Sequence, residues 1–448
     1  MSSQTAEKVD FGSGSISKLI LKLAPPVMLA QLIQALYNII DSFFIGRYSE
    51  KGLTALSVIY PIQLLMIALA VGTGVGINTL MSHFFGIGRN RKAQEAAGVG
   101  TVLSIAMWIV FAVVCYLIMP SYGRMSTDSD EVVRSVTIYG RIVCVFSVGL
   151  FTESVWTKIL QSEGNMKLPM AAQIIGAVVN IILDPLLIWG VWIFPKMGIA
   201  GAALATVIGQ AAAALIVMKK GFRKPPAVRK FPSLIKRIYK LGFPNILMQS
   251  AYTIYILGLN LILKEFSDQA VTALGLYYKW QTFFFIPLGA LQTCIVPVIS
   301  FNYASGRYVR CKKTLIDSVL MGMALMFIGT LSFEIIPSQL LSVFSGDPLV
   351  IKIGTVAFRW IGASFIPMSA SLIFPVFFQA IGYSLRSSLL TIVRTVVLFV
   401  PLAWLFSRAG LDYFWITYPV TEIITTAIGF VMYKHFENEN IKTKAEIS

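Results

Sequence analysis

Three carboxylic acids lie within apolar stretches of the first half of the chain, and an asparagine lies one helical turn from one of them. Asp41 lies in "ALYNIIDSFFIGR", Glu153 in "FTESVW", and Asn180 and Asp184 in "NIILDPLLIWG". If these stretches cross a bilayer, each charged side chain costs about 2.5–3.5 kcal/mol to insert, so an acid there indicates a function. Asn180 and Asp184 are four residues apart, which places them on one face of a helix, where they can converge on one ion or one hydrogen-bond network.

Buried acids of this kind can bind and release a cation. Burial disfavours the charged form of a carboxylic acid, and a second acid nearby disfavours it further, so a proton can be taken up on one side and released on the other. The oxygens of Asp41, Asp184 and Asn180, with a backbone carbonyl, could bind Na⁺ instead. In a third interpretation, Asp41 and Asp184 only pair with donors that lock helix packing. The sequence leaves all three roles open.

The elements that must position these residues are membrane-spanning helices. Apolar residues make up 56% of the 448 residues and charged residues only 13%, a composition typical of a polytopic membrane protein. Because backbone groups in lipid must be satisfied within a helix or a closed barrel, and the apolar runs are too long for barrel strands, we predict an all-α fold. Runs of about 20 apolar residues predict twelve transmembrane helices, near 19–45, 53–82, 96–119, 139–160, 169–193, 198–218, 241–263, 271–300, 314–337, 356–381, 386–406 and 413–433.

The charge distribution predicts the orientation in the membrane. The formal net charge is +16, but the basic residues lie between the predicted spans and not in one domain, which argues against a nucleic-acid partner. Segments 88–92, 219–240 and 306–313 are basic, so the positive-inside rule places them in the cytoplasm together with both termini. The first span is not preceded by a signal-peptide pattern. We expect a multi-pass protein of the cell (inner or plasma) membrane.

Residues for enzymatic chemistry are scarce. The chain has no nucleophile beside a base and no cluster of histidines and acids at ligand spacing, which argues against an enzyme and against any cofactor or resident metal other than a coupling ion. The four cysteines, Cys115, Cys144, Cys294 and Cys311, follow no disulfide or metal-binding pattern. The two histidines are His83 and His435.

The chain repeats itself at an offset of 218 residues. "LAPPVMLAQLIQALY" (23–37) matches "LGFPNILMQSAYTIY" (241–255), and the match continues into later spans. Each repeat holds six spans, so both halves enter the membrane in the same sense and are expected to be related by a pseudo-twofold axis along the membrane normal. We predict an N-terminal lobe (1–218), a basic cytoplasmic linker (219–240) and a C-terminal lobe (241–448), an organisation typical of transporters that expose their substrate alternately to each side.

Four stretches give the chain a family resemblance: "PPVMLAQLIQALYNIIDSFFIGR", "LTALSVIYPIQ", "LQSEGNMKLPM" and "NIILDPLLIWG" with "MGIAGAALAT". Together with the twelve spans and the repeat, the chain resembles the multidrug and toxic compound extrusion (MATE) transporters, in their MepA-like and DinF-like branch. The resemblance implies a cation-coupled antiporter that exports amphipathic, often cationic drugs in exchange for H⁺ or Na⁺. It also implies a cation site formed by Asp41, Asn180 and Asp184, with Glu153 as a weaker match. We expect the chain to act as a monomer.

Polar and aromatic residues predict the substrate contacts. Gln34, Asn38 and Asp41 recur at spacings of four and three and form a polar stripe on the first span. A cavity of aromatic and amide groups would accept varied flat amphipathic molecules, although each such residue could equally serve in packing. We assign substrate contacts to Gln34, Tyr37 and Asn38 in the first half, and to Asn245, Gln249, Tyr252, Tyr255, Tyr278 and Gln281 in the second.

A lipid-linked oligosaccharide flippase of the same broad superfamily is the alternative function. It would need cations in the cavity for a pyrophosphate group, and Arg141, Lys279 and Arg359 could supply them. Lys279 could equally extend its charge to the membrane surface. We predict that Arg394 and Glu422, in the last two spans, pair with each other or with polar partners in a structural role.

Overall fold

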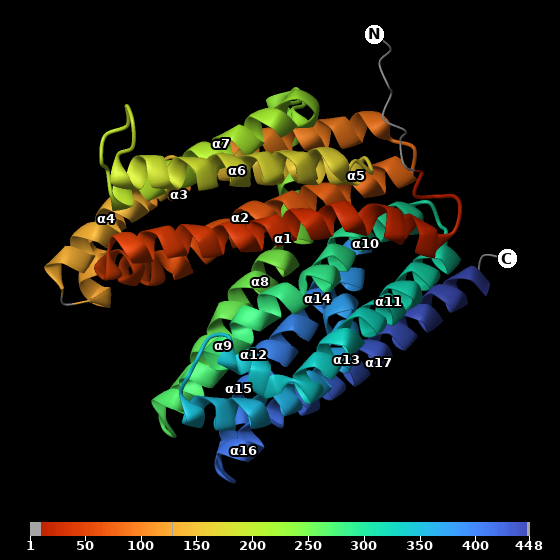
Figure 1. Ribbon diagram of the computed structural model, residues 1–448. Helices are drawn as coiled ribbons and strands as arrows, with labels where there is room; N and C mark the ends of the chain where they lie inside the picture. Colours follow the sequence, from red (N-terminus) through yellow and green to blue (C-terminus); the bar gives the residue numbers. More distant parts are fainter. Residues whose placement is uncertain (1–9, 128, 446–448) are drawn as a thin grey trace. The chain divides into compact units, whose positions relative to one another are not determined.

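The computed structural model describes residues 10–127 and 129–445, and every regular element within these ranges is helical (Figure 1). The first half contains α1 (Ile16–Tyr48), α2 (Glu50–Gly86), α3 (Asn90–Ser126), α4 (Asp130–Val145), α5 (Val148–Ser162), α6 (Lys167–Trp189) and α7 (Ile199–Gly221). The second half contains η1 (Val228–Lys230), α8 (Phe231–Lys264), α9 (Asp268–Phe284), α10 (Ile286–Ala304), α11 (Tyr308–Ile335), α12 (Pro337–Ser342), α13 (Pro348–Ala380), α14 (Ser384–Ile392), the π-helix η2 (Val393–Phe399), α15 (Val400–Ser407), α16 (Leu411–Phe414) and α17 (Thr417–Ala445).

The helices confirm the predicted all-α fold class and its twelve spans. Among the described residues, 11 helices are long and apolar enough to cross a membrane, and α4 with α5 makes a twelfth span that is bent by 43°. The helices extend beyond the predicted runs because hydropathy marks only the part in the lipid core, whereas the chain continues in helical form with polar residues. α4, for example, begins at Asp130, nine residues before the apolar run at 139.

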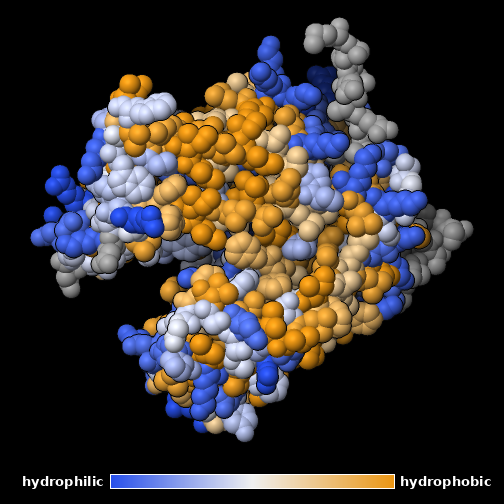
Figure 2. Space-filling model, in the orientation of Figure 1, coloured by the Kyte–Doolittle hydropathy of each residue, from blue (hydrophilic) through white to orange (hydrophobic). Residues whose placement is uncertain are grey.

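Hydrophobic residues cover the middle of the first-half helices. Figure 2 shows that the surface of α1, α6 and α7 is hydrophobic along most of its length and hydrophilic near the helix ends. This pattern matches a bundle whose middle contacts lipid and whose ends contact water and headgroups.

The chain divides into two compact units. The first unit contains residues 25–246 and the second contains residues 14–24 and 247 onward, as far as the described chain extends. The division within α1 falls between Ala24 and Pro25, at the tandem prolines Pro25 and Pro26. Residues 14–24, predicted to belong to the N-terminal lobe, therefore group with the second unit. There Ser17 Oγ donates to Asp317 Oδ2 over 2.7 Å.

The basic segment 219–240 is held against the first unit. Arg223 Nη2 donates to both carboxylate oxygens of Glu163, over 2.9 and 3.1 Å, and Lys230 Nζ donates to Glu95 Oε1 over 2.6 Å. The second half of this segment is helical, because α8 already begins at Phe231. The predicted linker is thus partly the start of a helix.

Candidate functional site

Asp41 of α1 meets Asp184 of α6 inside the first unit. The two side chains are 8% and 0% exposed, and their carboxyl groups lie within hydrogen-bonding reach of each other. Asn180, one turn before Asp184, donates from Nδ2 to Asp184 Oδ1 over 3.3 Å. The structure therefore brings together the three residues that the sequence analysis assigned to a cation site.

Several oxygens of this group have no donor. Apart from the mutual carboxyl contact, Asp41 Oδ1, Asp184 Oδ2 and Asn180 Oδ1 are buried without a hydrogen-bond partner among the described residues. Buried acceptors normally have a partner, because leaving one unpaired costs free energy. Two carboxyl groups in contact also repel each other unless a proton or a cation compensates their charge. The arrangement is suited to binding a cation.

The close packing of α6 against α7 positions Asn180. A Cβ on Gly209 would lie 2.6 Å from the carbonyl oxygen of Gly176 and 3.1 Å from Asn180 Cβ, so the two helices approach closely only because glycine lies there. Pro185 follows Asp184 directly and has no backbone N–H, so the carbonyl of residue 181 loses its usual helical donor. An additional backbone acceptor thus lies one turn before the acid pair.

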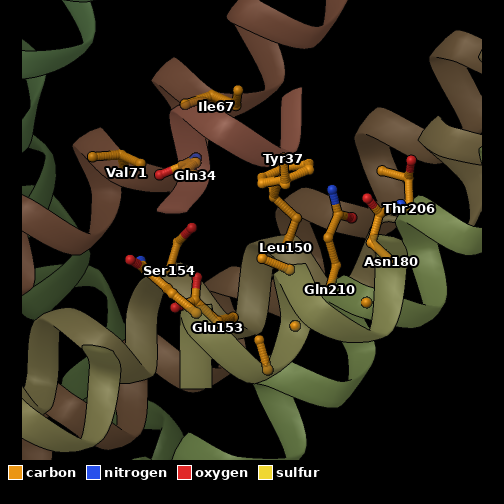
Figure 3. Close-up of a pocket in the computed structure, with 15 residues that line it drawn as sticks. Gln34, Tyr37, Ile67, Val71, Leu150, Glu153, Ser154, Asn180, Thr206 and Gln210 are labelled. Atoms are coloured by element: carbon orange, nitrogen blue, oxygen red, sulfur yellow. The ribbon is translucent and has the colours of Figure 1, made fainter. Parts of the chain in front are cut away.

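A cavity of about 150 Å³ opens beside the acid pair within the first unit (Figure 3). Its walls come from α1, α2, α5, α6 and α7. Asn180 lines the cavity and contacts Asp184, and Tyr37 lines it while interacting electrostatically with Asp41 and Asp184. The polar residues that line it are Gln34, Tyr37, Glu153, Ser154, Gln173, Asn180, Thr206 and Gln210.

Glu153 lies in the cavity wall and not in the acid pair. Its Oε1 accepts a hydrogen bond from Thr157 Oγ1 over 2.7 Å, and its carboxyl group also hydrogen-bonds with the side chain of Gln173. Glu153 and Tyr37 line the same cavity, and Tyr37 lies near Asp41 and Asp184. The geometry separates Glu153 from Asp41 and Asp184, in keeping with its weaker match to the family pattern.

The predicted substrate residues of the first half divide between the cavity and the surface. Gln34 and Tyr37 line the cavity, as Figure 3 shows, whereas Asn38 is exposed and does not belong to its wall. The spacing of four and three placed Asn38 on the same stripe as Gln34, but the cavity reaches only part of that stripe.

The predicted substrate residues of the second half lie among packed aromatic rings. Tyr252 donates from its hydroxyl to Gln281 Oε1 over 3.0 Å, and its ring centroid lies 6.3 Å from that of Tyr278. Tyr255 is only 2% exposed and stacks on Phe399 at 5.0 Å, which is a packing contact. The other two predicted residues, Asn245 and Gln249, are half-buried on α8.

Four polar lining residues were not predicted from the sequence: Ser154, Gln173, Thr206 and Gln210. Gln173 precedes Asn180 by seven residues, two helical turns on the same face, so the polar stripe of α6 could have indicated it. Gln210 is an isolated polar residue in the apolar run of α7, which is a weaker signal of the same kind. Thr206 gives no such signal, because threonine is common in helices and often bonds the backbone of its own helix, as Thr206 Oγ1 does with Ala202 O.

The predicted pairing of Arg394 with Glu422 is confirmed. Arg394 Nη2 donates to Glu422 Oε1 over 2.6 Å, Arg394 Nε contacts both carboxylate oxygens at 3.1 Å, and Ser371 Oγ also donates to Glu422. Among the cations of the flippase alternative, Arg141 Nε donates to the carbonyl of Tyr116, and Lys279 Nζ lies 4.9 Å from the ring centroid of Phe344. Neither lines the cavity.

Proteins of similar sequence are transporters. A protein from Shewanella oneidensis named FAD transporter is 24% identical over 432 residues, covering 92% of this chain and 93% of that protein. Multidrug export protein MepA of Staphylococcus haemolyticus is 24% identical over 410 residues, covering 90% of this chain and 89% of that protein.

Solved structures share the fold. A multidrug resistance MATE family transporter of the MOP superfamily, in an outward-facing conformation, superposes with a TM-score of 0.90 at 22% identity, covering 98% of this chain and 100% of that one. A MOP superfamily transporter from Pyrococcus furiosus, whose binding pocket is described as having reversed polarity, superposes with a TM-score of 0.89 at 22% identity, covering 96% and 98%.

The MatE family profile matches both halves of the chain, over residues 26–186 and 244–405. These two matches lie on the two predicted repeats and together cover more than half of the 448 residues. The chain therefore belongs to the MATE family, and is a multi-pass membrane transporter and not an enzyme.

Proposed function

We propose that this protein exports small amphipathic compounds in exchange for an entering cation, by alternating access, and that Asp41, Asn180 and Asp184 bind the coupling cation. The observation that carries the proposal is the buried contact of Asp41 with Asp184, with three oxygens that lack donors, beside a polar cavity. The relatives named as multidrug exporters and as an FAD transporter support export of small molecules.

The same contact supports a proton as the coupling ion. Two carboxyl groups can share a hydrogen bond only if one of them is protonated, so a proton fits the pair directly. Na⁺ would instead bind the carboxylate oxygens with Asn180 Oδ1 and a backbone carbonyl. The mutual contact of Asp41 and Asp184 favours the proton.

Ion and substrate would compete through shared residues. Asn180 both contacts Asp184 and lines the cavity, and Tyr37 lines the same cavity near Asp41 and Asp184. A cation that draws Asn180 Oδ1 toward the pair removes that oxygen from the substrate. By linkage, each ligand then weakens the binding of the other by the same factor, as an antiporter requires.

The cavity wall favours substrates that donate hydrogen bonds. Asn180 Oδ1 and Gln210 Oε1 are buried acceptors without a partner among the described residues, and both residues line the cavity. No lysine or arginine lies in this wall, so the pyrophosphate group of a flippase substrate would find no cation there. A flat ring system bearing N–H groups would satisfy both acceptors while its faces contact Tyr37.

Reconstituted vesicles test this function. We expect a pH gradient alone to drive uptake of a dye that carries aromatic NH₂ groups. Uptake of its fully N-methylated analogue should be slower, because Asn180 Oδ1 and Gln210 Oε1 then stay unpaired. Vesicles without protein are the control. Uptake driven by neither a pH gradient nor a Na⁺ gradient would contradict coupled export, and uptake driven by Na⁺ alone would contradict proton coupling.

We also propose that both termini and the basic segments face the cytoplasm of a cell whose plasma membrane holds the protein. Val228 lies in the basic segment and is 76% exposed, and Lys230 of this segment contacts Glu95 near the start of α3. Asp130 is exposed at the start of α4, which follows the other end of α3. In intact cells, Asp130→Cys should react with an impermeant thiol reagent and Val228→Cys should not. Labelling of Val228→Cys with protection of Asp130→Cys would reverse the orientation.

A further inference from the structure

The connection between α6 and α7 is a closed loop with an apolar tip. Residues 190–198 read "GVWIFPKMG", and the chain returns on itself where the Met197 and Gly198 amides donate to the carbonyls of Leu187 and Ile188, over 2.9 and 3.1 Å. At the tip, Trp192 is 93% exposed and Ile193 is 90% exposed. Figure 1 shows this loop extending outward from the ends of α6 and α7.

The tip is held in a strained conformation. Trp192 has φ 60°, and among the described residues it is the one residue other than glycine with positive φ. A bulky side chain disfavours this left-handed region, where glycine would carry no strain. Since almost the whole side chain of Trp192 is exposed, contacts within the protein do not compensate the strain. A contact outside the protein would account for a tryptophan at this position.

The loop begins where the lipid core ends. α6 has 23 residues, which at about 1.5 Å per residue make roughly 35 Å, slightly more than the roughly 30 Å of a bilayer's hydrocarbon core. Ile175, Val178 and Ile182 are spaced by three and four along α6 and are 45–55% exposed, as expected for a face that contacts lipid. Trp189, seven residues further on, continues this face into the loop.

The base of the loop packs against the end of α1 and includes a positively charged side chain, Lys196. A Cβ on Gly198 would lie 2.7 Å from the hydroxyl oxygen of Tyr48, so the loop approaches the end of α1 closely. Lys196 is exposed, and its Nζ lies 5.5 Å from the ring centroid of Tyr48. The loop thus carries a tryptophan, an isoleucine and a lysine. These residue types suit the boundary between the acyl chains and the phosphate groups of a membrane.

We propose that the 190–198 loop is an interfacial anchor, which inserts Trp192 and Ile193 among the lipids at the membrane surface and presents Lys196 to lipid phosphates. The indole ring lies at the level of the headgroups, where its N–H can reach a polar partner while its rings contact acyl chains. Because Met197 and Gly198 bond the last turn of α6, the anchor holds the helix that carries Asp184 at a constant depth.

Spin labelling tests the anchor in the full-length protein. Ile193→Cys is labelled with a nitroxide and reconstituted in phosphatidylethanolamine–phosphatidylglycerol vesicles. The four native cysteines are buried, so they should react little. We expect the label at residue 193 to collide more with dissolved oxygen, which concentrates in lipid, than with a water-soluble nickel chelate. Asp130→Cys, exposed at the start of α4, is the matched control and should show the reverse. Its neighbour Glu131 pairs with Lys51, and the next residue, Gly52, faces Ile199 directly after the loop.

Adding Trp192→Ser to the labelled protein should lower the ratio of oxygen to nickel collisions toward that of the Asp130→Cys control. Two results would overturn the proposal. A label at residue 193 with the accessibility of residue 130 would place the loop in water. A label shielded from both oxygen and nickel would show that a protein, either a second copy or another partner, covers the tip.

Discussion

Asp41→Asn and Asp184→Asn should each reduce ion-driven export to the level of vesicles without protein, while the chain still folds and inserts. Asparagine keeps the size of aspartate and its capacity for hydrogen bonds, but it cannot be protonated or carry the charge that holds a cation. The two residues contact each other and are 8% and 0% exposed, so each variant leaves the buried pair with a single carboxyl group. Uptake assays in vesicles measure the loss.

Two controls accompany these variants. Asp268→Asn removes one carboxylate at the exposed start of α9, outside the acid pair and the cavity, and should export normally. The unfolding temperatures of Asp41→Asn and Asp184→Asn should lie within about 4 °C of the wild type, a shift that corresponds to roughly 1–2 kcal/mol. If the acids only lock helix packing, stability should fall instead, and the surviving protein should keep its response to the ion.

Glu422→Ala should destabilise the fold by about 3–5 kcal/mol, because it leaves a buried guanidinium without its counter-charge. Arg394 is 8% exposed and donates from Nε and Nη2 to the carboxylate of Glu422, which also accepts a hydrogen bond from Ser371. These residues lie on η2, α17 and α13 of the second unit, so the variant weakens the packing of three helices. Thermal unfolding of the purified protein measures the effect.

Replacing both charges gives the matched control. Arg394→Met with Glu422→Leu removes the desolvated pair and should recover most of the lost stability, since buried ion pairs contribute little net free energy once desolvation is counted. Glu131→Ala breaks the contact with Lys51 at the surface, where the side chains are 63% and 55% exposed, and should cost under about 1 kcal/mol. A Glu422→Ala protein as stable as the Glu131→Ala protein would contradict the structural role of the pair.

The helices and the acids of the first unit follow closely from sequence patterns. Long apolar runs located the spans, since a backbone in lipid has few alternatives to the helix. The convergence of Asn180 and Asp184 followed from helical spacing alone. The approach of Asp41 to Asp184 depends on how α1 packs against the other helices, which spacing does not determine. The prediction that Asp41 and Asp184 act together came instead from the scarcity of other acids in the apolar runs and from the family resemblance.

The cavity was less predictable because its shape depends on tertiary packing. Gly176 and Gly209 allow the close approach of α6 and α7, whose Gln173 and Gln210 line the cavity, whereas Asn38 on α1 is exposed outside it. The second unit shows the same limit. Tyr255 occupies the repeat position of Tyr37, yet it is buried against Phe399, while Tyr37 lines the cavity. Equivalent positions in a repeat do not guarantee equivalent surroundings.

The binding of an export substrate to the purified protein, titrated at several pH values and Na⁺ concentrations, tests the central role of the acid pair most directly. In the wild type, the affinity for substrate should fall as the concentration of the coupling ion rises, because ion and substrate compete for Asn180. Asp41→Asn and Asp184→Asn should bind substrate with an affinity that no longer depends on the ion. Asn variants whose substrate affinity still changes with the ion as in the wild type would contradict the assignment of Asp41 and Asp184 to the coupling site.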